Sequence, residues 1–464
     1  MSDNLGTEKI SRLFMKMAIP SVISQLVVLV YNMVDRIFIG HIPDIGSTAL
    51  TGVGICMPVT LIVSAFAQLT GVGGAPLASM ALGRNDKEEA ERILGTCCFG
   101  MIVVSVLLTI TGLVFSEKIL FFFGASSNTI LYAREYLNIY LAGTIFVELT
   151  IGLTAFITAQ GFTAVTMVSV TAGAILNVFL DPLLIFGFHM GVKGAAIASV
   201  FSQMVSVFIA LLFLVRYENS VKMRMKYIRF DRKRIFVSMK LGLSPCIMVA
   251  TESFVSIAFN RSLLQYGGDL AVGSMTIFST IMQMITMPLQ GFSQGARPIT
   301  SYNFGTGNWK RVSENFKLLV AVSMIYACLL WGIILLFPNT FIRLFTSNVS
   351  LAEYNIKMIR IYFAVAGMMG LQYACQNTFL ALGNATVSIF LALLRKVILL
   401  LPLIFILPHV LPGQVKAVFW AEPFADMIAV TVTGILFFRK YGKSLCKKMA
   451  LIKKIYLVET QQKH

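Results

Sequence analysis

The chain has 464 residues, of which 57% are hydrophobic and only 13% are charged. Soluble proteins carry about 25% charged residues, so this composition excludes an ordinary globular enzyme, a disordered chain and a nucleic-acid-binding domain. The net charge is +17, but the basic residues gather between long apolar runs, so nucleic acid is not an expected partner. A transmembrane helix needs about 20 apolar residues, and the sequence therefore predicts an all-α integral membrane protein.

The apolar runs predict twelve transmembrane helices, six in each half of the chain. The predicted spans lie near residues 14–40, 49–80, 93–115, 136–158, 163–187, 194–216, 237–265, 270–300, 315–337, 355–381, 385–408 and 415–438. The first run is too long for the apolar core of a signal peptide, so we expect it to remain as the first span.

The distribution of Lys and Arg predicts the topology. With the N-terminus inside, 26 of the 38 Lys and Arg residues fall in cytoplasmic segments. We therefore expect a multi-pass protein of the cell (inner) membrane with both termini in the cytoplasm. Its predicted parts are an N-terminal lobe (1–220), a basic cytoplasmic linker (221–236), a C-terminal lobe (237–440) and a basic cytoplasmic tail (441–464). The linker and tail either contact anionic membrane lipid or act only as topology determinants.

The two halves of the chain resemble each other at an offset of about 220–225 residues. Pro20 in "AIPSVISQ" corresponds to Pro245 in "GLSPCIMV", and "DPLLIFG" at 181–187 corresponds to "LPLIFIL" at 401–407. Six spans per half is an even number, so both halves have the same orientation in the membrane. Two pseudo-symmetric six-helix lobes of this kind are typical of transporters, with the transport path between them.

Six acidic residues lie inside the predicted spans, where an ionisable group costs about 2.5–3.5 kcal/mol. They are Asp35, Glu148, Asp181, Glu252, Glu422 and Asp426. Because of this cost, such residues are expected to face a cavity or a partner, and they are the first candidates for function.

Other polar residues share helix faces with two of these acids. On the first span, Gln25 and Asn32 lie on the same face as Asp35. On the fifth span, Asn177 stands four residues before Asp181, again on one face. If the two faces converge, two carboxyl groups lie among amide oxygens in an apolar interior.

The sixth span repeats this spacing with Ser199 and Gln203. A pocket lined by carboxylate, amide and hydroxyl oxygens could hold a proton, because burial and a second carboxylate favour the protonated form. It could equally hold Na⁺, a hard cation that oxygen ligands suit. In the alternative interpretation, Asp35 pairs with Arg36 or caps a helix, and Asp181 marks a kink at the following proline.

Polar stripes also follow the seventh and eighth spans. On the seventh span, Glu252, Ser256 and Asn260 stand four residues apart on one face. On the eighth span, a stripe of three glutamines favours a wet cavity over lipid: Gln283, Gln290 and Gln294. We therefore include both stripes among the candidates for a substrate cavity.

Three further residues have two interpretations each. Met287 belongs to a group of methionines that could form an adaptable wall for varied ligands, or fill a lipid-facing surface. Glu422 and Asp426, four residues apart on the last span, could attract a cationic substrate or sit at a helix junction without a role in transport.

Motifs for cofactors, metals or chemistry are missing from the sequence. The four histidines are scattered singly, no CxxC pair occurs among the seven cysteines, and no GxxxxGK[ST] loop for a nucleotide is present. We expect no metal, no cofactor and no enzymatic activity, with H⁺ or Na⁺ as the only coupling ion.

Three segments resemble multidrug and toxic compound extrusion (MATE) transporters. They are "QLVVLVYNMVDRIFIGHI" at 25–42, "LNVFLDPLLIFGFHMGVKGAAIAS" at 176–199 and "GARPITSYNFGTGN" at 295–308. The similarity extends over nearly the whole chain. The bacterial DinF-like branch, with its MepA-like drug exporters, is the best fit.

This resemblance implies export of cationic or amphipathic compounds in exchange for H⁺ or Na⁺, through a central cavity that alternates between the two membrane faces. In the DinF-like branch, aspartates that match Asp35 and Asp181 carry the ion site, with an asparagine that matches Asn177. Ser199 falls where some members have threonine. The other main branch uses a seventh-span glutamate near Glu252 together with a tenth-span acid, which the span at 355–381 lacks.

Two other functions fit the same architecture. One is a flippase for a lipid-linked precursor or polysaccharide, although its cavity would be expected to be strongly basic. The other is an exporter of an endogenous metabolite. A receptor or scaffold protein would need neither the repeat nor carboxylates on matched helices. Transporters of this build can work as monomers, and we expect a monomer here.

Overall fold

The computed structural model describes residues 2–43, 45–217, 221–343 and 349–442. All regular structure in these ranges is helical. Among the described residues, ten helices are long and apolar enough to cross a membrane, and the number rises to twelve if each of two bent helix pairs forms one span. The predicted all-α membrane fold with twelve spans is therefore confirmed.

The helices form two compact units, which we call unit 1 and unit 2. Unit 1 is mainly Lys16–Phe254, and unit 2 combines Asp3–Met15 with the chain from Val255 onward. The boundaries of these two units differ from those of the lobes expected at 1–220 and 237–440. The lobe boundaries stay a prediction. The predicted tail at 441–464 lies almost entirely outside the described residues.

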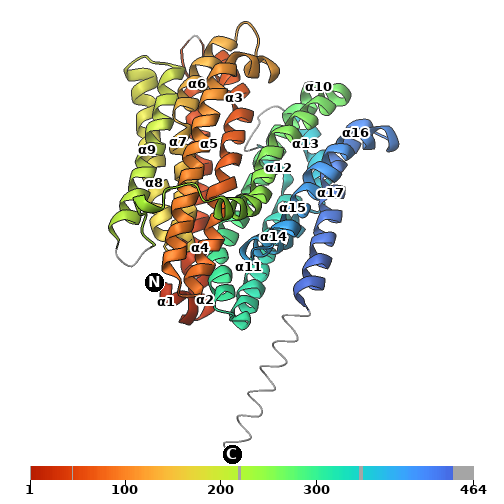
Figure 1. Cartoon of the computed structure of the whole chain (residues 1–464). Coiled ribbons are helices and arrows are strands. Elements are labelled where there is room, and N and C mark those ends of the chain that lie inside the picture. Colours follow the sequence, from red (N-terminus) through yellow and green to blue (C-terminus); the bar gives the residue numbers. More distant parts are fainter. Residues whose placement is uncertain (1, 44, 218–220, 344–348, 443–464) are drawn as a thin grey trace, which may run out of the picture. The chain divides into compact units, whose positions relative to one another are not determined.

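In Figure 1, unit 1 runs from red-orange to light green, and Asp3–Met15, in the deepest red, belongs to unit 2. The residues of α1 (Ser2–Thr7) and α2 (Ile10–Gly40) that lie between Asp3 and Met15 belong to unit 2. Unit 1 contains the rest of α2, followed by α3 (Gly46–Ala67), η1 (Gln68–Val72), α4 (Gly73–Gly83), α5 (Lys87–Phe122), α6 (Ile130–Ala142), α7 (Thr144–Ala159), α8 (Thr163–Pro182), η2 (Leu183–Gly187), α9 (Val192–Arg216), η3 (Met225–Tyr227) and the first part of α10 (Arg232–Gly305). The segments η1 and η2 are π-helical, and they interrupt spans that are otherwise α-helical.

Unit 2 begins inside α10 and continues to the end of the described chain. Its elements are α11 (Trp309–Leu336), α12 (Pro338–Arg343), α13 (Val349–Tyr362), η4 (Ala366–Met368), α14 (Met369–Ala381), α15 (Ala385–Leu393), η5 (Leu394–Leu400), α16 (Leu401–Val410), α17 (Gln414–Phe437) and η6 (Phe438–Gly442). The π-helix η5 interrupts the eleventh span, as η2 does the fifth. These spans correspond in the two halves of the repeat.

Two predicted spans are bent. The span expected at 136–158 consists of α6 and α7, which meet at Gly143 with an angle of 52°. The span expected at 355–381 is bent by 44° between Tyr362 and Ala366. Hydropathy alone does not reveal these bends, because the residues on both sides of each break are apolar.

The seventh and eighth spans are joined with almost no connecting loop. Both belong to α10, which is broken at Gly268, where φ is 62° and ψ is −161°. A positive φ is costly for residues with a side chain, and glycine adopts it readily. The chain therefore ends one span at Gly268 and begins the next at Leu270.

Close helix contacts in unit 1 depend on glycine. A Cβ atom added to Gly242 of α10 would lie 1.9 Å from the carbonyl oxygen of Leu69, and one added to Gly73 would lie 2.2 Å from the carbonyl oxygen of Ser238. Neither position has room for a side chain. These glycines let the first part of α10 pack directly against η1 and α4.

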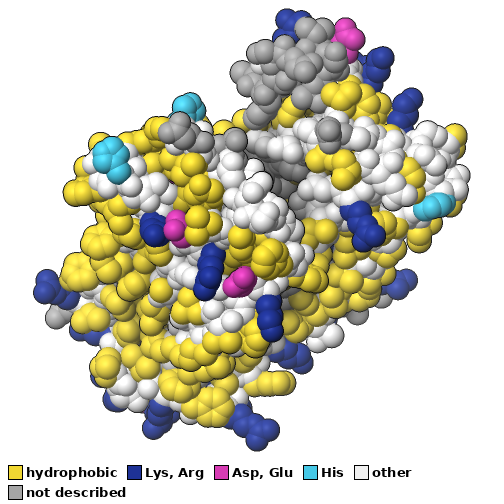
Figure 2. Space-filling model, turned by 90° about the horizontal axis from the view of Figure 1, so that it is seen from above, with side chains coloured by type: hydrophobic (Ala, Val, Ile, Leu, Met, Phe, Trp, Pro, Cys, Tyr) yellow, Lys and Arg dark blue, Asp and Glu magenta, His cyan; other side chains and the backbone are white. Residues whose placement is uncertain are grey.

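The outer surface is apolar, as expected of a protein surrounded by lipid. Figure 2 shows hydrophobic side chains over much of the visible face and few acidic ones. Large side chains such as Phe122, Phe179 and Leu336 are 79%, 71% and 74% exposed. A soluble protein rarely exposes a contiguous surface of this kind.

The basic linker is held against the start of α5 by ion pairs. Arg234 contacts Glu89 at 2.6 Å, and Arg224 contacts Glu91 at 2.7 Å. Asp231 caps the start of α10 by accepting a hydrogen bond from the backbone N–H of Arg234 at 3.0 Å. This bond and the Arg234 guanidinium hold the pKa of Asp231 below its usual value. The acidic start of α5 is therefore a docking site for the linker.

Candidate functional site

Two buried carboxyl groups meet in the interior of unit 1. Asp35 lies on α2 and Asp181 lies near the end of α8, and the residues are 8% and 0% exposed. Their carboxyl groups are hydrogen-bonded to each other. An ionised carboxylate can only accept hydrogen bonds, so this contact needs a proton on one of the two groups. We call these residues the Asp35–Asp181 pair.

The local sequence explains why Asp181 lies at an irregular part of its helix. Pro182 follows it and has no backbone N–H, so one helical hydrogen bond is missing there. The chain then continues as the π-helix η2. Insertions of this kind are frequent at functional sites because they redirect side chains within a helix.

Asn177 lies one turn before Asp181 and is fully buried. Its Nδ2 donates a hydrogen bond to Oδ1 of Asp181 at 3.3 Å. Three oxygens of this site are buried without a hydrogen-bond partner in the described part of the chain: Asp35 Oδ1, Asn177 Oδ1 and Asp181 Oδ2. The site therefore combines acidic groups for a proton with free oxygens suited to a hard cation.

Two tyrosines interact with the Asp35–Asp181 pair and a third is stacked on one of them, and the sequence analysis missed all three. Tyr31 interacts electrostatically with both aspartates, and its side chain is hydrogen-bonded to Gln203. Tyr136 also interacts with Asp35, and its ring is stacked on Tyr140 with ring centroids 6.2 Å apart. Tyr31 could have been found from the sequence, since it stands four residues before Asp35 on the same helix face.

Arg36 does not form an ion pair with Asp35 in the described part of the chain. Arg36 is exposed, and its Nη2 lies 3.2 Å from the sulfur of Met57. Arg36 still interacts electrostatically with Asp35, so the alternative in which Asp35 is paired with its neighbour stays open.

The remaining first-half candidates differ in their surroundings. Gln203 contacts the site through Tyr31. Asn32 uses its side chain to donate to the carbonyl oxygen of Val28 at 2.8 Å. Gln25 and Ser199 are half-buried. Their roles stay predictions.

The candidates on the seventh and eighth spans all lie on α10. Glu252, Ser256 and Gln283 are exposed, whereas Gln290, Gln294 and Met287 are half-buried. Glu252 belongs to unit 1 and the others belong to unit 2. Their assignment to a substrate cavity stays a prediction.

A buried charged cluster lies in unit 2, which we call the Arg395 cluster. Arg395 of η5 contacts Asp426 of α17 at 2.6 Å and Glu422 of α17 at 3.1 Å. The three residues are 7%, 2% and 4% exposed. Both acids of the last span are thus paired with an arginine, so they are not free charges awaiting a cationic substrate. The sequence analysis did not identify Arg395 as their partner.

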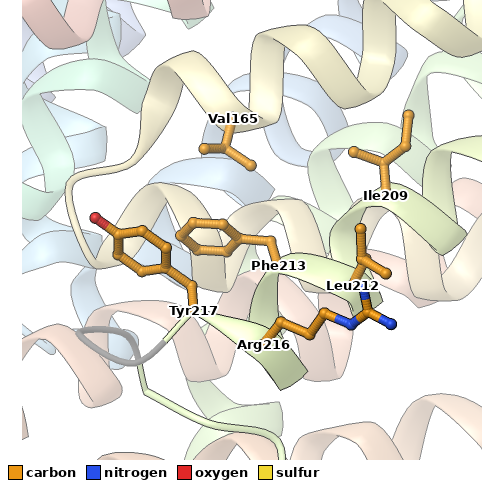
Figure 3. Close-up of a pocket in the computed structure, with 6 residues that line it drawn as sticks. All are labelled: Val165, Ile209, Leu212, Phe213, Arg216 and Tyr217. Atoms are coloured by element: carbon orange, nitrogen blue, oxygen red, sulfur yellow. The ribbon is translucent and has the colours of Figure 1, made fainter.

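A groove of about 340 Å³ lies elsewhere in unit 1, along α8 and α9. Figure 3 shows Phe213 and Tyr217 side by side, with Val165 on the opposite wall and Arg216 at the edge. The two aromatic rings are stacked with centroids 5.0 Å apart. None of the residues that line it belongs to the predicted sites.

The family model described as MatE matches the chain twice, at residues 20–183 and 245–406. The chain belongs to the MATE transporter family. The two matches lie one in each half, at the offset expected from the internal repeat. Members of this family are transporters and not enzymes, in agreement with the sequence analysis, and the protein is a multi-pass membrane protein.

Named relatives of this MATE transporter are multidrug exporters. The multidrug export protein MepA of Staphylococcus haemolyticus is 22% identical over 96% of this chain and 96% of its own length. MepA of Staphylococcus aureus is 24% identical over 91% of this chain and 93% of its own length. The predicted resemblance to MepA-like exporters is confirmed.

Solved MATE structures match the fold. The MATE multidrug transporter DinF-BH, solved in complex with R6G, is 32% identical, with a TM-score of 0.87 and coverage of 94% of this chain and 97% of its own. A MOP superfamily transporter from Pyrococcus furiosus shares 21% identity and a TM-score of 0.87, covering 95% of this chain and 98% of its own. The latter likeness shows the fold alone.

Proposed function

We propose that this MATE transporter is a secondary antiporter that exports cationic or amphipathic compounds in exchange for H⁺ or Na⁺ by alternating access. The observation that carries the proposal is the Asp35–Asp181 pair, with Asn177 beside it. Relatives named as multidrug export proteins and the R6G complex of DinF-BH support this substrate class.

The geometry favours H⁺ as the coupling ion. The hydrogen bond between the two carboxyl groups needs a proton, and its loss would leave two negative charges close together in an apolar interior. Na⁺ is the alternative, because three unpartnered oxygens are available to it. The proton and the substrate need only stabilise different conformations of the protein for transport to be coupled.

The proposal extends to the setting of the protein in the membrane. The excess of Lys and Arg in the inside segments supports cytoplasmic termini. Polar residues on α2, α9 and α10 are proposed to line the path of the substrate, and the protein is proposed to act as a monomer.

Ethidium efflux from proteoliposomes tests the proposal, with a pH gradient and a Na⁺ gradient imposed separately. We expect the wild type to respond to one gradient. Asp181→Asn and Asp35→Asn should each reduce the rate of gradient-driven efflux by about 5- to 150-fold, which is the factor that corresponds to a typical coupling free energy.

Glu117→Gln is the matched control, because Glu117 is an exposed carboxylate, with its side chain 58% exposed and 3.8 Å from Arg134. It should leave efflux unchanged. Gradient-driven efflux that persists in correctly folded Asp181→Asn would show that the site is wrongly assigned. An absence of transport in the wild type under both gradients would favour a lipid or metabolite substrate instead.

A further inference from the structure

Glu148 is a buried acid that is not part of the proposed ion site. It lies on α7 and is 0% exposed. Neither Oε1 nor Oε2 has a hydrogen-bond partner in the part of the chain that the structure describes. The Arg395 cluster, by contrast, gives each of its buried acids a guanidinium partner.

An ionised carboxylate in these surroundings would be strongly unfavourable. Burial removes the water that stabilises the charge, and no described ion pair or hydrogen bond replaces it. The free energy is lowered only when a cation neutralises the group. A proton does so without extra space or further ligands, whereas a metal cation needs several oxygen ligands around it.

Titratable side chains connect Glu148 to the ion site. Within the described residues, Glu148 interacts electrostatically with Tyr140 of α6 and Cys246 of α10. Tyr140 interacts in turn with Tyr31, and Tyr31 interacts with both aspartates of the Asp35–Asp181 pair. Tyr140 and Tyr31 therefore lie between Glu148 and the Asp35–Asp181 pair in this series of interacting side chains.

Neutral polar groups also contact Tyr140 or lie close to Glu148 in the chain. The Tyr140 side chain is hydrogen-bonded to Ser64 of α3. Thr144, one turn before Glu148 on α7, has a buried hydroxyl oxygen without a partner among the described residues. Hydroxyl groups can both donate and accept hydrogen bonds, so they can stabilise a proton without holding a fixed charge themselves.

We propose that Glu148 is a second proton-binding site of unit 1, separate from the Asp35–Asp181 pair, and that it exchanges its proton during the transport cycle. Binding of the proton requires no other reactant, because a carboxylate oxygen and H⁺ form a neutral carboxyl group. The exchange during transport rests on the proposed antiport function. The binding of the proton does not.

Infrared difference spectroscopy on the purified protein tests the binding step. Spectra recorded in mildly acidic and in alkaline buffer should show a carbonyl band of protonated carboxyl groups in the wild type. Glu148→Gln should lose part of this band, whereas Glu117→Gln should keep all of it. Asp35→Asn should lose a different part, because the two sites are separate.

Two spectroscopic results would overturn the inference. The first is a band in correctly folded Glu148→Gln that is identical to that of the wild type. The second is a loss of the Glu148 part of the band in Asp35→Asn when Na⁺ is added at constant pH, because Glu148 would then be a cation site. Glu148→Asp, which keeps the carboxyl group, should restore the band and serves as the check on folding.

Transport measurements test the exchange step. Glu148→Gln should still bind ethidium, but its efflux should depend on pH differently from that of the wild type. An unchanged pH profile would refute the exchange. A wild type that shows no proton-driven efflux would refute the antiport function, while the infrared result would still decide whether Glu148 binds a proton.

Discussion

Removal of the Arg395 guanidinium should destabilise unit 2 strongly. In Arg395→Met, a side chain of similar length replaces the arginine without its charge. Glu422 and Asp426 then remain buried, four residues apart on α17, with no guanidinium between them. Both residues are less than 5% exposed, so water cannot replace the lost partner.

The size of the effect follows from the burial of the cluster. Removal of one partner from a buried ion pair costs about 3–5 kcal/mol, because an uncompensated charge stays inside. For a unit of this size, about 2–4 °C of melting temperature corresponds to 1 kcal/mol. We therefore expect the melting temperature of Arg395→Met to fall by about 6–20 °C.

Tryptophan fluorescence during heating in detergent is a suitable assay. The three tryptophans, Trp309, Trp331 and Trp420, all lie in unit 2 and report on its unfolding. A triple variant in which Glu422→Gln and Asp426→Asn accompany Arg395→Met removes all three charges of the Arg395 cluster, and it should recover most of the lost stability. A loss below about 1 kcal/mol in Arg395→Met, the size of an exposed ion pair, would refute this account.

Two further predictions concern unit 1. Gly242→Ala places a Cβ atom 1.9 Å from the Leu69 carbonyl oxygen and should cost about 1–3 kcal/mol. Gly54→Ala, with no atom within 4 Å, is the control in the same thermal assay, and equal losses in both variants would contradict the packing argument. Asp231→Ala removes the cap of α10 and should cost about 1 kcal/mol at neutral pH. Because folding lowers the pKa of Asp231, its contribution is present above the unfolded value of about 4 and is lost as the pH falls through the folded value. A stability difference that persists in strong acid would argue against this.

The sequence predicted the spans well because their apolar runs are long. The runs at 163–187 and 194–216 correspond closely to α8 with η2 and to α9. The bends at Gly143 and after Tyr362 could not be predicted, since a bend inside an apolar run leaves the hydropathy unchanged. The π-helices also escaped prediction, because they depend on which backbone hydrogen bonds form and not on side-chain polarity.

For the candidate site, prediction depended on distance along the chain. The contact between Asn177 and Asp181 follows from four-residue spacing on one helix. The meeting of Asp35 with Asp181 was only a conditional expectation, because it depends on how α2 and α8 pack. Arg395 lies 27 residues before Glu422, so their pairing has no periodic signal. Only the packed structure shows that this arginine serves both acids.

The break in α10 at Gly268 has a practical consequence for mapping topology. Because one span ends at Gly268 and the next begins at Leu270, an epitope tag or reporter inserted between them would force two spans apart. The predicted outer side offers longer connections between helices for an insertion, at 123–129 and 411–413. A failed insertion at Gly268 would thus indicate a lack of space between the two spans. It would not show on which side of the membrane Gly268 lies.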